Sequence, residues 1–101
     1  MILGIYGSGG LGREIYDIAV RRNAEYPRWE TIIFIDDIAD EGDYYGTKRI
    51  KLNSSIKLTA PLECIVAVGE PSLREKLYDR IVDAGIPLTS IIDTKAIVSP
   101  S

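Results

Sequence analysis

A glycine-rich motif near the start of the chain is its strongest signal for binding chemistry. Six successive residues match the pattern G-x-G-x-x-G: Gly7, Ser8, Gly9, Gly10, Leu11 and Gly12. In this pattern the first glycine permits a tight turn, the second lets a phosphate approach the backbone, and the third lets a helix pack close to a strand. The N–H groups and the dipole of a helix that starts here attract an anion. The motif therefore predicts a diphosphate site, although such turns also occur simply to connect two elements.

Charged residues in two further places could extend this site. Arg13 follows the motif directly, where its guanidinium would either reach a phosphate or remain solvated. Asp36 lies 24 residues after Gly12, near the roughly 20-residue spacing at which an acidic side chain contacts a ribose hydroxyl. Asp37 comes next, and both carboxylates are also consistent with a plain strand end or turn.

The residue composition excludes other kinds of site. The 101 residues include no His, which removes His-based acid–base catalysis and imidazole metal ligands from this polypeptide, and we expect no metal site. If the protein is an enzyme, its catalytic base is another residue type or lies elsewhere. The lone Cys64 lies in an apolar run and is expected to be a buried strand thiol. With 12 basic and 15 acidic residues the net charge is −3, so we expect no nucleic-acid partner. No apolar run approaches the ~20 residues of a membrane span and no leader is recognisable, so we expect a cytoplasmic protein without a membrane partner.

The elements that hold these residues follow from hydropathy patterns. Residues 2–6 and 31–35 are apolar runs typical of buried parallel strands, and 23–30 is a connecting segment. Between the two strands, one face of a predicted helix carries the apolar residues Leu11, Ile15, Ile18 and Ala19. A short strand or hairpin around 47–50 is expected at a sheet edge.

The same order of elements occurs a second time. A predicted strand at 62–68 ends at Gly69 and Glu70, and a last short strand is predicted at 88–92. The helix that follows Glu70 has a first-turn proline, a capping box, an apolar stripe and a glycine stop, formed by Pro71, Ser72 with Glu75, Leu73 with Leu77 and Ile81, and Gly85. This order predicts an α/β fold, a small Rossmann-like parallel sheet with helices on both faces. The glycine motif and the Gly69–Glu70 turn should then form opposing walls of one crevice.

Four blocks of sequence, taken in order, resemble one family. They are IYGSGGLGRE at 5–14, FIDD at 34–37, VAVG at 66–69 with LREKL at 73–77, and SIIDTKAIVS at 90–99. Together they resemble the N-terminal domain of bacterial sugar O- and N-acetyltransferases of the sialic acid O-acetyltransferase and UDP-N-acetylbacillosamine N-acetyltransferase type. The resemblance implies a Rossmann-like domain that binds the nucleotide part of a UDP-sugar for glycan biosynthesis. It also implies a following left-handed β-helix of hexapeptide repeats, which binds acetyl-CoA, forms a homotrimer and carries a catalytic His.

The resemblance also assigns parts of this chain. It implies that residues 1–92 are the nucleotide-sugar-binding domain, inactive alone, and that 93–101 begin the β-helix or form a linker. It puts the diphosphate at Gly9, Gly10, Leu11, Gly12 and Arg13. Asp36 and Asp37 would meet the nucleoside, and Gly69 with Glu70 the facing wall.

Two other functions fit the same residues. An NAD-binding fragment of an oxidoreductase, or an NAD sensor, would use the glycine motif and Asp36 equally well for an adenosine ribose. However, a full dinucleotide site usually needs two mononucleotide-binding halves, and this chain has room for little more than one. The third possibility is a structural or regulatory α/β module whose glycine loop is empty.

Overall fold

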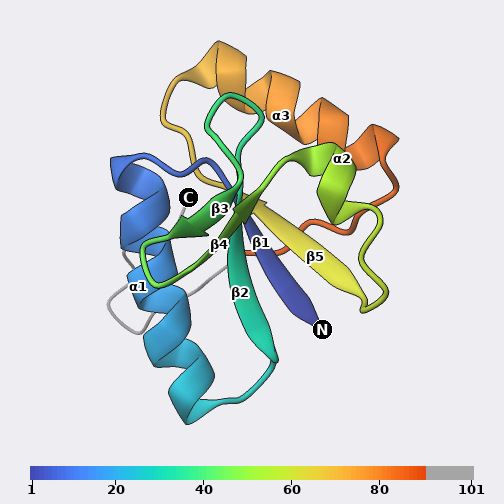
Figure 1. Cartoon of the computed structure of the whole chain (residues 1–101). Coiled ribbons are helices and arrows are strands. Elements are labelled where there is room, and N and C mark those ends of the chain that lie inside the picture. The colour runs from blue at the N-terminus through green and yellow to red at the C-terminus, as the bar shows by residue number, and fades with distance from the viewer. Residues whose placement is uncertain (91–101) are drawn as a thin grey trace.

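The computed structural model describes residues 1–90, which fold around one mixed sheet (Figure 1). Its five strands have the order β3-β4-β2-β1-β5. Their bounds are β1 Ile2–Tyr6, β2 Thr31–Ile35, β3 Gly42–Tyr44, β4 Thr47–Ile50 and β5 Leu62–Val66. The helices in the described residues are α1 Gly10–Glu25, α2 Leu52–Ser55 and α3 Pro71–Asp83.

The parallel strands place their carboxyl ends at one edge of the sheet. β1 pairs in parallel with β2 on one side and with β5 on the other, with Tyr6 opposite Ile35 and Val66. The chain therefore builds the sheet outward from β1 in one direction, through β2 and β4, and then returns to add β5 on the opposite side. This reversal next to β1 is the place where open α/β sheets bind ligands.

Helices cover both faces of the sheet, as the alternating elements predict (Figure 1). α1 contributes Ile15, Ile18 and Ala19 to a core against one face, and α3 contributes Leu77 and Ile81 to a core against the other. Successive residues of a strand point to opposite faces. For that reason Ile5 of β1 belongs to the first core and Tyr6 to the second. The α/β, Rossmann-like fold predicted from the sequence is confirmed.

Helix α1 differs from its prediction at both ends. It runs to Glu25, so residues 23–25 are helical rather than part of the connecting segment. Leu11 was expected on the buried face, but its side chain is 38% exposed. Leu11 instead lines a pocket at the start of α1, and in this first turn Gly12 is the buried residue.

Helix α3 begins as the proline predicts but with a different cap. Glu70 is the N-cap residue, and its carboxylate accepts a hydrogen bond from the Leu73 N–H, so the predicted capping box of Ser72 and Glu75 is wrong. Pro71 occupies the first turn, which leaves Ser72 inside the helix. Leu73 was expected in the buried stripe but is 40% exposed, whereas the stop near Gly85 agrees with its φ of +73°.

The remaining predicted strands are found in part. The segment around 47–50 forms an antiparallel hairpin, with β3 at the sheet edge and positive φ angles at Tyr45 and Gly46 in its turn. Of the strand predicted at 88–92, the described residues show one parallel bridge, between Leu88 and Cys64. Cys64 is fully buried, as expected. The rest of that strand and the predicted start of a β-helix at 93–101 lie outside the described residues.

Candidate functional site

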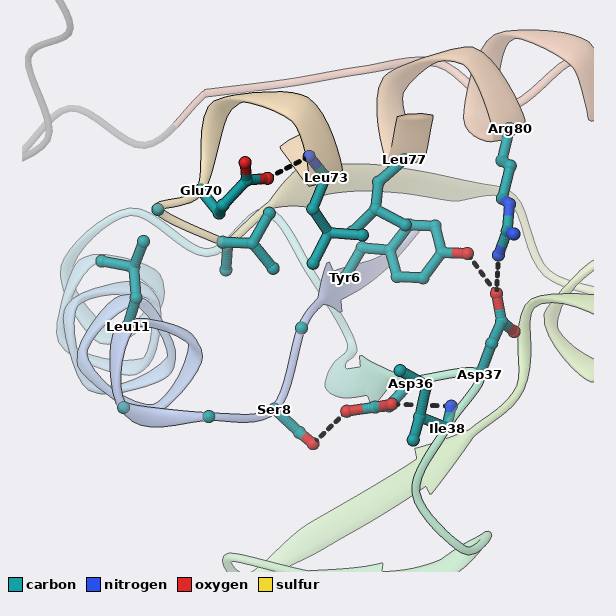
Figure 2. Close-up of a pocket in the computed structure, with 16 residues that line it drawn as sticks. Tyr6, Ser8, Leu11, Asp36, Asp37, Ile38, Glu70, Leu73, Leu77 and Arg80 are labelled. Carbon is teal, nitrogen blue, oxygen red and sulfur yellow. Dashed lines mark hydrogen bonds and ion pairs between the residues drawn. The ribbon is translucent and has the colours of Figure 1, made fainter. Parts of the chain in front are cut away.

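A pocket of about 460 Å³ lies at the carboxyl ends of β1, β2 and β5 (Figure 2). Its two walls are the glycine motif and the turn that leads into α3, which the sequence predicts to face each other. The candidate residues that line it are Gly7, Ser8, Gly9, Gly10, Leu11, Asp36, Asp37, Gly69 and Glu70. Gly12 and Arg13, also candidates, do not line it. Its volume falls within the roughly 300–1,000 Å³ usual for small-molecule sites.

The positions of the motif differ in whether, and why, the fold requires glycine there. Gly7 has a φ of +124°, and a Cβ there would lie 2.6 Å from the Ala67 carbonyl oxygen. A Cβ at Gly12 would lie only 2.0 Å from the Gly7 carbonyl oxygen, so this glycine lets α1 pack against the loop. By contrast, a Cβ at Gly9 or Gly10 would meet no atom of the described residues within 4 Å. The protein's own packing therefore does not require glycine at 9 and 10, whereas a ligand lying against the backbone would.

The start of α1 offers unpaired backbone donors to the pocket. The first N–H groups of any helix lack intrahelical partners, and within residues 1–90 no side chain caps this one at Gly9. The partial positive charge of the helix N-terminus is directed to the same place. A phosphate or another anion matches both features.

Asp36 fixes the loop from the end of β2. Its carboxylate accepts hydrogen bonds from Ser8 Oγ at 2.6 Å and from the N–H groups of Ile38 at 2.9 Å and Ala39 at 3.1 Å. Burial alone would raise the pKa of Asp36, but these hydrogen bonds outweigh it and hold the pKa below its ordinary value. Asp36 is therefore ionised at neutral pH, and the 7% exposed Ser8 is held in place.

Asp37 joins three elements at the other end of the pocket (Figure 2). It accepts hydrogen bonds from the Tyr6 hydroxyl, from Arg80 Nη1 at 3.0 Å and from the Leu52 N–H at 2.9 Å. Burial would raise the pKa of Asp37, but the hydrogen bonds from Tyr6 and Leu52 and the charge of Arg80 lower it overall. Burial, and then the hydrogen bond to Asp37, raise the pKa of Tyr6 to about 12. The phenol is thus neutral and the carboxylate charged.

Sequence reasoning did not identify Tyr6 and Arg80 as lining residues. A signal existed for both, since Tyr6 directly precedes the motif and Arg80 shares one helical face with Leu73 and Leu77. Leu73 and Leu77 form an apolar wall of the pocket on this face of α3. Two exposed apolar residues, Leu11 and the 91% exposed Ile38, lie at its rim. The pocket therefore brings together the start of a helix, two carboxylates and an apolar surface.

Two more candidate residues, besides Asp36 and Asp37, form hydrogen bonds within the protein. Arg13 lies outside the pocket and donates from Nη1 to the Tyr44 hydroxyl at 2.9 Å. Glu70 lines the pocket, but its carboxylate caps α3, and the hydrogen bond from the Leu73 N–H lowers its pKa. Trp29 and Tyr44 pack against the α1 side of the sheet.

The described residues limit the chemistry further. Within 1–90, no cluster of three or more His, Cys, Asp or Glu side chains is placed to hold a metal ion. None of the helices in this range has the length and apolar character needed to cross a membrane.

Comparisons with known proteins identify the family and the fold of this chain. The family model described as the PglD N-terminal domain matches residues 2–81. The fold is similar to that of WeeI from Acinetobacter baumannii AYE, with a TM-score of 0.81 and 26% sequence identity over 93% of this chain and 44% of WeeI. The chain thus spans less than half the length of that protein. Because the match covers most of the chain, the protein belongs to the PglD N-terminal domain family, which confirms the resemblance to the N-terminal domain of these acetyltransferases.

Proposed function

We propose that this chain binds a UDP-sugar and acts as the nucleotide-sugar-binding domain of a sugar O- or N-acetyltransferase. The observation that carries the proposal is the uncapped start of α1 beside Gly9 and Gly10, where open space lies against the backbone on one wall of the pocket. Such a place suits a diphosphate. Membership of the family supports the sugar nucleotide as the source of that diphosphate.

The charges in the pocket indicate how the ligand would lie. The ionised Asp36 and Asp37 repel phosphate but accept hydrogen bonds, so they suit the hydroxyl and N–H groups of a nucleoside. The diphosphate would then lie at Gly9 and Gly10. The apolar wall at Leu73 and Leu77 would contact a flat or weakly polar part of the ligand.

The contribution of this domain to a reaction would be positioning. Holding the remote nucleotide fixes the sugar amine or hydroxyl for attack, which is how binding energy distant from the reacting atoms raises a rate. In the whole protein, acetyl-CoA would be the acyl donor. We assign acetyl-CoA binding, the catalytic His and the homotrimer contacts to the hexapeptide-repeat domain that the sequence resemblance implies.

Calorimetric titration of the 101-residue chain tests the proposal. UDP and UDP-sugars should release heat and saturate at one ligand per chain, and uridine should bind more weakly because it lacks the diphosphate. NAD is titrated in parallel, since it has the same diphosphate but a second nucleoside. Heat from NAD and none from UDP would overturn the proposal in favour of an NAD-binding domain.

A further inference from the structure

Tyr44, on the β3–β4 hairpin, connects an edge of the sheet to the glycine motif. Its hydroxyl donates a hydrogen bond to the Ser8 carbonyl oxygen at 2.5 Å and accepts one from Arg13 Nη1 at 2.9 Å. Ser8 belongs to the motif and Arg13 follows it directly. A single phenol thus holds the loop and the first turn of α1 together, although 36 residues separate Tyr44 from Ser8.

The Tyr44 ring is itself held from two directions. The Phe34 ring packs edge-on against it, with the centroids 5.2 Å apart. The Arg49 guanidinium lies 4.0 Å from the ring centroid and donates to the Asp40 carbonyl oxygen at 2.9 Å and to Ser8 Oγ at 3.4 Å. These contacts fix the position of the Tyr44 hydroxyl, so the hydroxyl can restrain the loop instead of moving with it.

The hydrogen bonds at Ser8 determine which way the next amide faces. The Ser8 side chain donates to Asp36, and its carbonyl oxygen accepts from Tyr44. The C=O and N–H of a trans peptide unit point in opposite directions. The hydrogen bond to Tyr44 therefore turns the Gly9 N–H away from the hairpin, which does not line the pocket, while Gly9 itself does.

We propose that Tyr44 is a positioning residue for anion binding by the glycine loop. It does not line the pocket, and it acts by holding the Ser8–Gly9 peptide in the orientation in which the Gly9 N–H is free for a phosphate oxygen. The inference rests on the proposed function and identifies which residue prepares that site. Without the hydroxyl, the ligand would have to order the loop as it binds, which lowers affinity.

The test compares Tyr44→Phe with Tyr45→Phe in the 101-residue chain. Tyr44→Phe removes both hydrogen bonds of the hydroxyl and keeps the ring packed on Phe34. Tyr45→Phe is the matched control, because the neighbouring hydroxyl donates instead to Asp17 Oδ2 at 3.1 Å, away from the loop. Affinities for UDP, inorganic pyrophosphate and uridine are measured by NMR titration, and melting temperatures of the free proteins establish that each variant is folded.

The expected results separate positioning from general stability. Tyr44→Phe should weaken UDP and pyrophosphate binding by about 5- to 10-fold, the effect of one or two lost hydrogen bonds, and leave uridine binding unchanged. It should also shift the free-state amide resonances of Gly9 and Gly10. Tyr45→Phe should change none of these affinities by more than about twofold, which is the small effect of a remote surface substitution, and should leave the Gly9 and Gly10 resonances in place.

Two results would overturn the inference. If Tyr44→Phe binds UDP and pyrophosphate as tightly as the unmodified chain, the hydroxyl does not prepare the site. If uridine binding falls equally, the effect is not confined to the anion site. The proposed function fails in a different way, when the unmodified chain binds pyrophosphate but not UDP, and the comparison on pyrophosphate then still decides the role of Tyr44.

Discussion

Replacing Gly12 by Ala should destabilise the fold without involving any ligand. A Cβ at this position would lie 2.0 Å from the Gly7 carbonyl oxygen, whereas real Cβ atoms come no closer than 3.0 Å to their neighbours. The loop and α1 must therefore separate by about 1 Å, and both are backbone that is packed on the sheet. Overpacking of this kind costs about 2–3 kcal/mol of unfolding free energy. For a domain of this size that lowers the melting temperature by on the order of 10 °C.

Gly9→Ala, in the same loop, should weaken UDP binding and leave the stability of the fold nearly unchanged. A Cβ there meets no atom within 4 Å, and the backbone is extended with a φ of −81°, which alanine adopts freely. Loss of a good N-cap residue and the lower entropy of the unfolded chain nearly cancel, so the free energy of unfolding should change by less than about 0.5 kcal/mol. The methyl group stands where the phosphate approaches, and UDP affinity should fall by about 10- to 100-fold, as loss of a charge-assisted hydrogen bond predicts.

Urea unfolding and UDP calorimetry on both variants provide the assay. The reasoning assigns one glycine to folding and the other to binding, so the two measurements must separate. A Gly9→Ala protein whose free energy of unfolding is as low as that of Gly12→Ala, or that binds UDP like the unmodified chain, would refute it. So would a Gly12→Ala protein with full stability.

Two further predictions concern the pocket residue Tyr6 and the buried Glu63. Tyr6 has its pKa raised from 10.0 to about 12, so the neutral phenol stabilises the fold fully below pH 10 and this stability is lost as pH rises toward 12. Between pH 10 and 12 the free energy of unfolding of Tyr6→Phe should therefore fall by about 2–3 kcal/mol less than that of the unmodified chain, as measured by urea unfolding. An identical pH dependence in both proteins would contradict the assignment. Glu63, only 4% exposed, accepts hydrogen bonds from Arg28 Nε at 2.7 Å and Trp29 Nε1 at 2.6 Å. Glu63→Gln should lower the free energy of unfolding by about 1–3 kcal/mol, followed by the fluorescence of this single tryptophan, with unchanged UDP affinity; a weaker UDP complex would count against a purely structural role.

Local patterns predicted the strands and the place of the loop because they depend on residues close in sequence. The apolar run before Gly7 and the spacing of the glycines determine a strand, a turn and a helix start without reference to the rest of the chain. Pro71 also indicated the correct N-cap residue, since a proline in the first turn places the cap at Glu70 rather than at Ser72.

Contacts between distant segments were beyond the sequence patterns. The Tyr6–Asp37 hydrogen bond joins residues 31 apart, and Arg80 reaches Asp37 across 43 residues. Such pairs depend on the relative placement of β1, β2 and α3, which no local spacing encodes. The predicted apolar stripes also included two residues that are not buried, because a periodic pattern indicates the face of a helix but not how much of its length is covered. Leu11 and Leu73 therefore lie at the pocket instead of in the core.

The different caps of α1 and α3 give the pocket a direction. Both helices begin at its walls, but the carboxylate of Glu70 neutralises the positive end of α3, while the positive end of α1 stays open. On a third side Asp36 is ionised and Asp37 is paired with the lining residue Arg80, so the start of α1 is the positive end of the pocket that no carboxylate of the described residues caps. An elongated ligand with one anionic segment can then settle in only one head-to-tail sense. Every bound molecule would present the same end to whatever stands beyond the rim.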